Sequence, residues 1–349
     1  MKLGIVGCGR ITEKHLLALA QVQEISIVAL SDLSIERMKQ AEALIPFKSS
    51  ELKLYEDYHE LLLSDCDLIL VATASGTHVS IARDALRANK HVLVEKPLAL
   101  SIEESRELRT LASVQKKHLF VCHQLRFRKA LHEIKGFIEA GLLGQIYTGT
   151  VSMAIQRPLD YYKAAPWRGT WEQDGGMLIN QGIHMIDLLC WYLGEVRTVS
   201  GQLQWIHTHK ETEDVALGTI QFQSGATGLI EANSVTWPTN YGYGLKVFGE
   251  KGTIILEGKN YDQLSVYMVE DGPSEKEFTK FLSEKNEQTI MYREIVKHIN
   301  NQPNDAVTAD ESERALETIF ALYQSHKQKS PVILPLNQFK TTDMKGVTD

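Results

Sequence analysis

The sequence predicts two α/β domains: a doubly wound parallel sheet, followed by a domain built on a large, mostly antiparallel open sheet. Three observations support this expectation. Short apolar runs alternate with helical patterns up to Cys122, two-residue alternation dominates after Leu125, and a pair of glycines stands where the first strand turns into the first helix. A length of 349 residues also suits two domains, at roughly 100–200 residues each.

The N-terminal strands are nearly continuous in Val, Ile and Leu, which is typical of strands buried on both faces of a parallel sheet. Helical patterns separate them, as in repeated βαβ units. The expected strands are Leu3–Val6, Ile25–Leu30, Leu68–Ala72, His91–Val94 and Leu119–Cys122, and the expected helices are Glu13–Gln21, Ile35–Leu44, Tyr58–Leu63, His78–Ala88 and Ile102–Gln115.

The second part of the chain alternates apolar and polar residues, as strands do when one face of their sheet is packed. We expect domains of 1–123 and 124–336 and a polar, frayed tail of 337–349. The expected strands are Ile146–Ile155, Thr198–Ile206, Val215–Phe222, Thr227–Ser234, Leu245–Val247 and Ile254–Leu256, with helices at Lys129–Ala140, Met177–Leu193 and Ser312–Lys327. Apolar strand residues need covering, so we expect a homodimer or homotetramer formed through this sheet; these residues are Ile220, Phe222, Leu229, Val247 and Ile255.

Composition excludes several classes of protein. The net charge of −7, without a basic block, argues against nucleic acid as a partner. The longest apolar run, Leu188–Leu193, is far too short to span a bilayer. The four scattered cysteines favour neither a disulfide framework nor a metal site, and the N-terminus has no signal-peptide pattern. We therefore expect a cytoplasmic enzyme with no metal.

The first strand-to-helix turn has the pattern of a dinucleotide-binding loop. Gly7 and Gly9 match the first two glycines of G-x-G-x-x-G, and Thr12 stands at the third. Gly7 permits the tight turn, Gly9 permits close approach of a pyrophosphate, and the helix N-terminus supplies N–H groups. Thr12 is compatible with this if the helix–strand contact is slightly wider. The alternative is a strand-to-helix turn that binds nothing.

Asp32 ends the second strand, where a carboxylate accepts hydrogen bonds from a ribose 2′-hydroxyl and repels a 2′-phosphate. This favours NAD over NADP as the cofactor. Arg37 leaves NADP open as the alternative, because it could reach a 2′-phosphate if its loop folds back.

Several further motifs occur in order along almost the whole chain. They are Gly7-Cys8-Gly9-Arg10-Ile11, Ala72-Thr73-Ala74-Ser75-Gly76-Thr77-His78, Glu95-Lys96-Pro97, Arg126-Phe127, Trp167-Arg168-Gly169-Thr170, Gly175–Asp187 with Asn180 and His184, and Phe248–Thr253. With them the chain resembles the glucose-fructose oxidoreductase / inositol dehydrogenase / MocA (Gfo/Idh/MocA) family. The resemblance implies a Rossmann domain, a C-terminal α/β domain and hydride transfer between nicotinamide and a hydroxyl or keto carbon of a sugar, sugar nucleotide or cyclitol.

The family's lysine and histidine match Lys96 and His184, which the resemblance implies as the catalytic pair. Hydride leaves a carbinol carbon only as its hydroxyl proton is removed, so one of them must act as a base. Histidine has a suitable intrinsic pKa, and a charged lysine stabilises an alkoxide. Which of the two is the base is left open. A buried structural histidine is the alternative for His184.

The resemblance also implies the residues around the two ligands. Those expected at the cofactor are Gly7, Cys8, Gly9, Arg10, Ile11, Asp32, Arg37, Thr73, Ala74, Ser75, His78, Glu95, Lys96, Pro97, Gln124, Trp167 and Arg168. Those expected at the substrate are Lys96, Arg126, Tyr161, Arg168, Asn180 and His184. The Lys96–Pro97 bond is a candidate cis peptide.

The chain departs from the family at Asn180, where many members have an aspartate four residues before the histidine. An amide can orient substrate but cannot stabilise an imidazolium. The run Asn180-Gln181-Gly182-Ile183-His184 resembles the branch that includes UDP-N-acetylglucosaminuronate 3-dehydrogenases. Two alternatives stay open: a non-catalytic NAD-binding regulatory protein, and an enzyme that keeps its NAD bound and uses it transiently.

Overall fold

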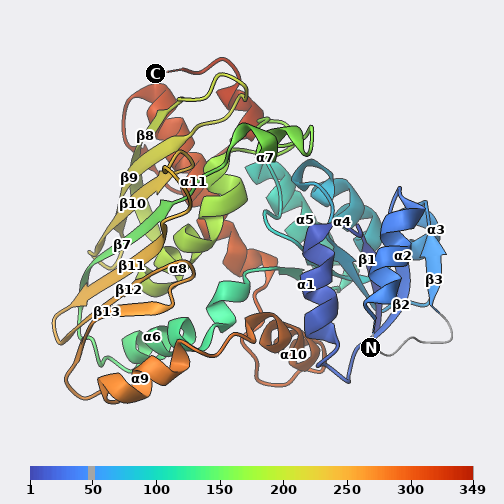
Figure 1. The fold of residues 1–349 in the computed structure, drawn as a ribbon, viewed down its shortest axis with the longest axis horizontal. Helices are drawn as coiled ribbons and strands as arrows, with labels where there is room; N and C mark the ends of the chain where they lie inside the picture. The colour runs from blue at the N-terminus through green and yellow to red at the C-terminus, as the bar shows by residue number, and fades with distance from the viewer. Residues whose placement is uncertain (46–51, 349) are drawn as a thin grey trace. The chain divides into compact units, whose positions relative to one another are not determined.

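The computed structural model describes residues 1–45 and 52–348. They fold as two compact units, which Figure 1 shows in ribbon form. The first unit consists of Met1–Phe127 and Asn286–Ser312, and the second of Arg128–Lys285 and Glu313–Asp349.

Residues 286–312 belong to the first unit, although the sequence placed them in the second domain. Helix α10 (Glu287–Ile299) buries Met291, Tyr292 and Ile295 in the core of the first unit. Farther along, the amide of Val121 donates to the carbonyl of Val307 at 3.1 Å. The first unit is therefore built from two separate stretches of chain.

Six strands of the first unit form a sheet in the order β3-β2-β1-β4-β5-β6, and every neighbouring pair is parallel. This confirms the predicted doubly wound sheet. The strand order reverses direction beside β1, so the carboxyl ends of β1 and β4 form the switch point at which such sheets bind ligands. The strands are β1 (Lys2–Val6), β2 (Ser26–Ser31), β3 (Lys53–Tyr55), β4 (Leu68–Val71), β5 (His91–Val94) and β6 (Leu119–Val121).

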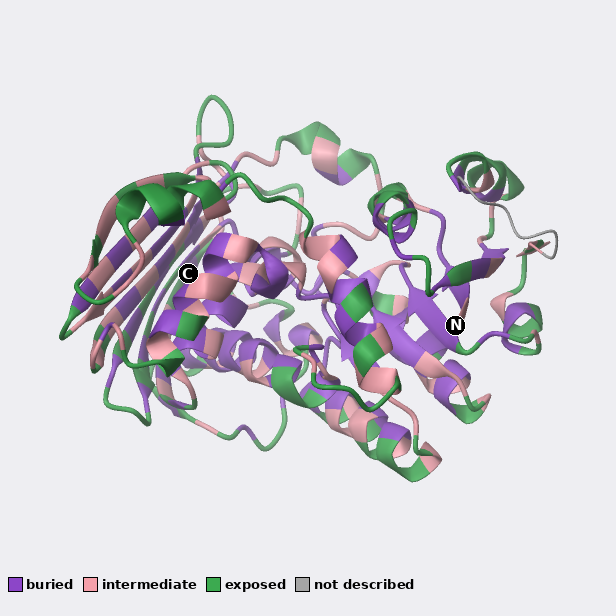
Figure 2. Cartoon of the chain, turned by 90° about the horizontal axis from the view of Figure 1, so that it is seen from below, coloured by how far each residue is buried: buried purple, intermediate pink, exposed green. Residues whose placement is uncertain are grey.

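Both faces of this sheet carry a hydrophobic core. Along β4, Leu68 and Leu70 belong to one core and Ile69 and Val71 to the other, as the two-residue period of a strand requires. Figure 2 shows the buried strands between their helices. One core contains residues of α1 (Arg10–Leu19), α2 (Ile35–Ala43) and α10, and the other contains residues of α3 (Tyr58–Leu62), α4 (His78–Arg87) and α5 (Ile102–Gln115).

The second unit contains an eight-stranded sheet in the order β13-β12-β11-β7-β10-β9-β8-β14. β10 runs parallel to β7, and the other neighbouring pairs of these described strands are antiparallel. The predicted mostly antiparallel sheet is thus confirmed. The strands are β7 (Ile146–Ala154), β8 (Val196–Gln204), β9 (Val215–Phe222), β10 (Thr227–Asn233), β11 (Gly242–Gly249), β12 (Gly252–Glu257), β13 (Gln263–Val269) and β14 (Val332–Ile333).

Burial alternates residue by residue along β9 and β10, and Figure 2 shows this as alternating colours on the strands. The packed face meets α8 (Ile183–Leu193) and α11 (Ala309–Gln328) at close range. A Cβ at Gly149 would lie 2.8 Å from Leu189 of α8, and one at Gly201 would lie 2.4 Å from Leu322 of α11. The remaining helices of this unit are α6 (Lys129–Glu139), α7 (Leu159–Lys163) and α9 (Glu275–Phe281).

The other face of the sheet is less apolar than the sequence suggested. Ile220, Phe222 and Val247 are buried within the chain's own core and need no covering partner. Leu229 is 45% exposed and Ile255 is half-buried, so these two lie on the open face.

Three other details differ from the sequence-based expectations. The predicted helix Met177–Leu193 begins as a π-helical turn, Leu178–Gly182, before α8. The tail is packed rather than frayed: Phe339 and Met344 are buried, and Thr341 Oγ1 donates to the Trp171 carbonyl at 2.5 Å. The strands and α-helices missed from the sequence are β3, β13, β14, α7, α9 and α10. Within the described residues, no helix is both long and apolar enough for a membrane span.

Candidate nucleotide and substrate sites

The glycine loop follows β1 and has the geometry of a phosphate-binding turn. Gly7 has a φ of +98°, and a Cβ there would lie 2.5 Å from the Ala72 carbonyl oxygen, so only glycine fits. Gly9 precedes α1 as its N-cap, and no atom lies within 4 Å of where its Cβ would stand. The start of α1 is therefore open to close approach by an anion.

Thr12, which stands at the third glycine position, ties the loop to the helix. Its side chain is buried, and its Oγ1 donates a 2.7 Å hydrogen bond to the Gly7 carbonyl. The hydroxyl thus supports the turn from inside.

Asp32 follows β2 and lies directly beside the glycine loop. Its Oδ2 accepts from the Cys8 amide at 2.8 Å, and its Oδ1 accepts from the Ser34 amide at 2.9 Å. Each carboxylate oxygen keeps a second lone pair with which a ribose hydroxyl could bond. Burial and the neighbouring Asp32 raise the pKa of the Cys8 thiol to about 12, so Cys8 serves as a small residue rather than as a nucleophile. Arg37 is exposed in the first turn of α2.

The loop after β4 carries Thr73, Ala74 and Ser75 at the same sheet edge. His78, also expected at the cofactor, is buried beneath this loop. Its Nδ1 lies 2.7 Å from the Pro97 carbonyl and its Nε2 lies 3.2 Å from the Thr73 carbonyl. Burial lowers the pKa of His78, which favours a neutral ring that donates from one nitrogen. His78 therefore braces two loops of the site.

Glu95 follows β5 and is the centre of a buried network. Its Oε1 lies 2.8 Å from His15 Nε2, and its Oε2 accepts from the Lys96 amide at 3.2 Å. On the other side of the ring, His15 Nδ1 lies 2.7 Å from the Tyr292 hydroxyl. Cys122 lies close enough that His15, Glu95 and Cys122 could each offer an atom to a metal ion. Burial raises the pKa of the Cys122 thiol well above its usual value.

Lys96 is half-buried at the carboxyl end of β5, and the Lys96–Pro97 peptide bond is cis, as expected. Gln124 begins a short 3-10 helix after β6. Arg126 in that helix is buried, and its Nη2 donates to the Glu311 carbonyl at 3.4 Å. The fold thus brings five predicted segments to one edge of the parallel sheet: Gly7–Gly9, Asp32, Thr73–Ser75, Glu95–Pro97 and Gln124, after β1, β2, β4, β5 and β6 respectively.

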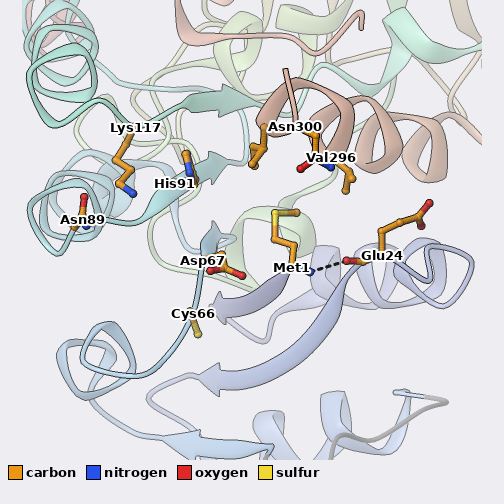
Figure 3. Close-up of a pocket in the computed structure, with 10 residues that line it drawn as sticks. Met1, Glu24, Cys66, Asp67, Asn89, His91, Lys117, Val296 and Asn300 are labelled. Atoms are coloured by element: carbon orange, nitrogen blue, oxygen red, sulfur yellow. Dashed lines mark hydrogen bonds between the residues drawn. The ribbon is translucent and has the colours of Figure 1, made fainter. Parts of the chain in front are cut away.

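A pocket of about 510 Å³ opens at the opposite edge of the same sheet. Figure 3 shows Asp67, His91 and Lys117 around it, and these residues lie at or just before the starts of β4, β5 and β6. It is therefore separate from the predicted nucleotide edge.

In the second unit, the π-helical turn presents Asn180 and Gln181, and His184 lies half-buried in the first turn of α8. Asn180 Nδ2 donates to Asp174 Oδ1. Gln181 Nε2 donates to the Tyr161 hydroxyl at 2.9 Å. Two expected substrate contacts, Asn180 and Tyr161, are thus each held by a hydrogen-bonded neighbour.

Two guanidinium groups flank the Tyr161 ring. The Cζ atoms of Arg168 and Arg157 lie 4.3 Å and 5.1 Å from the ring centroid. Arg168 Nη1 also donates to the Tyr161 carbonyl at 2.9 Å, and Arg157 Nη1 donates to the Gln156 carbonyl at 2.9 Å. Within the described part of the chain neither arginine pairs with a carboxylate. Trp167 lies beside Arg168, with its ring 5.4 Å from the Arg168 Cζ.

Glu213 is a buried carboxyl beneath the glycine pair that precedes the π-helical turn. Its Oε1 accepts from the Leu178 amide at 2.9 Å and from the Tyr323 hydroxyl at 2.6 Å. A Cβ at Gly176 would lie 2.7 Å from its Oε2. Burial raises the pKa of Glu213 to about 7. Sequence reasoning missed Glu213, Asp174, His15 and Tyr292, because their partners are distant in the chain or bear no motif.

Two family models match the chain. Residues 1–123 match one described as an oxidoreductase family, NAD-binding Rossmann fold, and residues 135–334 match its C-terminal alpha/beta domain. Myo-inositol 2-dehydrogenase of Thermotoga maritima is 25% identical over 96% of this chain and 98% of its own.

Two solved structures are similar over 97% of this chain. The WlbA dehydrogenase of Bordetella pertussis, solved with NADH and UDP-GlcNAcA, is 29% identical with a TM-score of 0.90, covering 97% of this chain and 98% of its own. The Chromobacterium violaceum WlbA dehydrogenase, in complex with the same two molecules, is 29% identical with a TM-score of 0.89, covering 97% and 96%.

Proposed function

The chain belongs to the Gfo/Idh/MocA oxidoreductase family, and from this premise we propose that its substrate is an anionic sugar nucleotide, a UDP-N-acetylamino-sugar uronate oxidised at a ring hydroxyl. Membership makes the chain an NAD-dependent oxidoreductase that acts on CH–OH groups. The proposal concerns which member of the wider class of sugars, sugar nucleotides and cyclitols it takes.

The observation that carries the proposal is the arginine pair around Tyr161. Arg168 donates to a backbone carbonyl, and Arg157 donates to a backbone carbonyl and to Oδ1 of Asn240 at 3.5 Å. Among the described residues, no carboxylate forms an ion pair with either guanidinium group. Guanidinium groups match carboxylate and phosphate geometry. A neutral cyclitol would make no use of two such charges, whereas a sugar nucleotide with a uronate group carries both kinds of anion.

Lys96 and His184 handle the hydroxyl proton in this proposal. NAD, when bound, would supply the acceptor for the hydride of the carbinol carbon. One of the two side chains takes the hydroxyl proton as the hydride leaves, and the other orients the oxygen. Lys96 lies in the first unit and His184 in the second. We expect Lys96→Ala to reduce kcat about 10²- to 10⁴-fold.

The cofactor-lining and substrate-contacting residues predicted above form the rest of this proposal. Asp32 supports NAD over NADP, because its carboxylate lies at the glycine loop, where a 2′-phosphate would meet like charge. We expect Gly9 and Asp32 variants to bind NADH more weakly while the fold stays intact.

We further propose a cytoplasmic homodimer or homotetramer assembled through the open face of the eight-stranded sheet. Leu217 and Leu229 are 47% and 45% exposed on neighbouring strands β9 and β10, and a partner would cover them. Sedimentation should show Leu229→Arg dissociating while Leu63→Arg, an exposed site of the first unit, does not. A monomeric wild type at micromolar concentration would refute the proposal.

The substrate is tested by following NADH formation with UDP-N-acetylglucosaminuronate, UDP-N-acetylglucosamine and myo-inositol. We expect the uronate to have the highest kcat/KM. Arg157→Ala should raise KM for UDP-N-acetylglucosaminuronate more than for UDP-N-acetylglucosamine. Only the uronate has a sugar carboxylate whose contact with the guanidinium group is lost in this variant. Equal kcat/KM for inositol and the uronate would reject the substrate proposal.

A further inference from the structure

Asp174 is a buried carboxylate that holds two separate segments of the second unit. It is 3% exposed, and its Oδ2 accepts from the Gly169 amide at 2.7 Å. Its Oδ1 accepts from Nδ2 of Asn180 in the π-helical turn. Gly169 directly follows Arg168 in one loop, which we call the arginine loop. The Asp174 carboxylate therefore joins the arginine loop to the turn that precedes His184.

The polarity of the Asp174–Asn180 hydrogen bond determines how the Asn180 amide is turned. A carboxylate oxygen accepts and an amide NH₂ donates, so the nitrogen of Asn180 faces Asp174. The carbonyl oxygen Oδ1 of Asn180 is therefore directed to the other side of the amide. Without the carboxylate, the two ends of the amide could exchange places by rotation about χ2.

We infer that Asp174 is a positioning residue, which orients Asn180 so that its Oδ1 accepts a hydrogen bond from a hydroxyl or N–H group of the substrate. The inference rests on the proposed function, because it takes Asn180 as a substrate contact. It adds a specificity rule: the substrate group that meets Asn180 must be a donor. An analogue with a keto or methoxy group in that position would face an oxygen and be rejected.

The same carboxylate sets the arginine loop. Gly169 has a φ of +74°, and a Cβ there would lie 2.8 Å from Lys210 Cβ, so the loop is closely packed at this point. The bond from the Gly169 amide to Asp174 holds the loop beside the π-helical turn. Asp174 therefore keeps two predicted substrate contacts, Arg168 and Asn180, in register with each other.

Exchanging the carboxylate and the amide between positions 174 and 180 tests the inference. In Asp174→Asn, one amide oxygen must serve two donors, so we expect kcat/KM to fall about 10- to 100-fold. In Asn180→Asp, two carboxylates face each other and one must bind a proton, so activity should recover as the pH falls. In the double variant Asp174→Asn/Asn180→Asp, the amide at 174 accepts from Gly169 and donates to the carboxylate at 180. The hydrogen bonds from the Gly169 amide and between positions 174 and 180 are then both restored.

We therefore expect the double variant to exceed both single variants in kcat/KM and to lose the pH dependence of Asn180→Asp. Asp160→Asn, an exposed residue of α7, is the matched control and should behave as the wild type. Unchanged kcat/KM in Asp174→Asn, or single effects that simply add in the double variant, would overturn the inference. A loss of Tm without any change in kcat/KM or its pH profile would also overturn it, because that result assigns Asp174 a purely structural role.

Failure of the proposed function gives a different result. If the wild type oxidises none of the sugars, the proposed substrate class is wrong. The pH dependence of Tm can still be compared among the wild type, the two single variants and the double variant. This comparison tests whether Asn180 donates to Asp174. If the wild type oxidises a sugar and the Asp174→Asn variant matches it, the proposed function stands and this inference alone fails.

Discussion

His15 Nε2 lies 2.8 Å from Glu95 Oε1, and this contact anchors the segment that carries Lys96. Both side chains are buried. His15→Ala would remove this hydrogen-bond partner from a buried carboxyl group, so we expect the free energy of unfolding to fall by about 2–3 kcal/mol. Tyr292→Phe removes only the hydroxyl that bonds the far side of the ring and should cost about 1 kcal/mol. Urea unfolding monitored by fluorescence measures both; equal losses in the two variants would contradict this ranking.

The glycine loop predicts opposite results for its two glycines. Gly7→Ala would place a Cβ 2.5 Å from the Ala72 carbonyl in a residue with a φ of +98°, so it should destabilise the first unit and abolish NADH binding. In Gly9→Ala the new Cβ would have no protein atom within 4 Å, so Tm should stay nearly unchanged. NADH binding should weaken, because the pyrophosphate could no longer approach the backbone as closely. Calorimetric Tm and NADH fluorescence titration distinguish the two effects. Unimpaired NADH binding by Gly9→Ala would show that the pyrophosphate does not approach there.

Local patterns predicted most of the fold. His91–Val94, Ile102–Gln115 and Val215–Phe222 have the predicted bounds, because each combines a clear period with a clear boundary signal. Helix α10 was missed because it packs with α1 and the segment Gln124–Phe127 in the first core, and these partners are distant in the chain. The mixed burial of β13 and the two-residue length of β14 gave too weak a period to detect.

In the candidate site too, local motifs could be predicted from the sequence, whereas contacts between distant residues could not. The glycine loop and Glu95-Lys96-Pro97 were recognisable because their chemistry lies within a few consecutive residues. The partnerships of Glu95 with His15 and of Asn180 with Asp174 depend on how the chain folds, and no spacing rule contains them. His78 combines both cases, since it lies in a recognisable motif and also joins two loops through the Pro97 and Thr73 carbonyls.

Asp32 predicts the balance between the two nicotinamide cofactors. Asp32→Asn keeps a carbonyl acceptor for a backbone amide but loses the charge that repels a 2′-phosphate. We expect the preference for NADH over NADPH to narrow at least about tenfold, since hydrogen bonds to charged groups contribute about 1.5–3 kcal/mol. Dissociation constants for both cofactors provide the measurement. Arg37→Ala is the control and should not strengthen NADPH binding. An unaltered ratio of the NADH and NADPH dissociation constants in Asp32→Asn would show that Asp32 does not contact the ribose.

Glu213 predicts a pH dependence of stability. Burial, opposed in part by Lys210, raises its pKa in the folded protein to about 7 from an ordinary value of 4.5. Between these values the folded state binds more protons than the unfolded state. The stabilising contribution of the carboxyl is therefore complete below about pH 4.5 and is lost as the pH rises through 7, at up to about 1.4 kcal/mol per pH unit.

The expected outcome follows from removing that titration. Glu213→Gln keeps an oxygen that can accept from the Leu178 amide and the Tyr323 hydroxyl, but it cannot ionise. Its unfolding free energy, compared with that of the wild type, should therefore rise between pH 5 and about pH 7 and level off toward pH 8. Glu231→Gln, an exposed residue of β10, should give a constant difference across this range. Parallel curves of unfolding free energy against pH for Glu213→Gln and the wild type would mean that Glu213 does not titrate in this range. Only a group whose pKa differs between the folded and unfolded states can give the two curves different slopes.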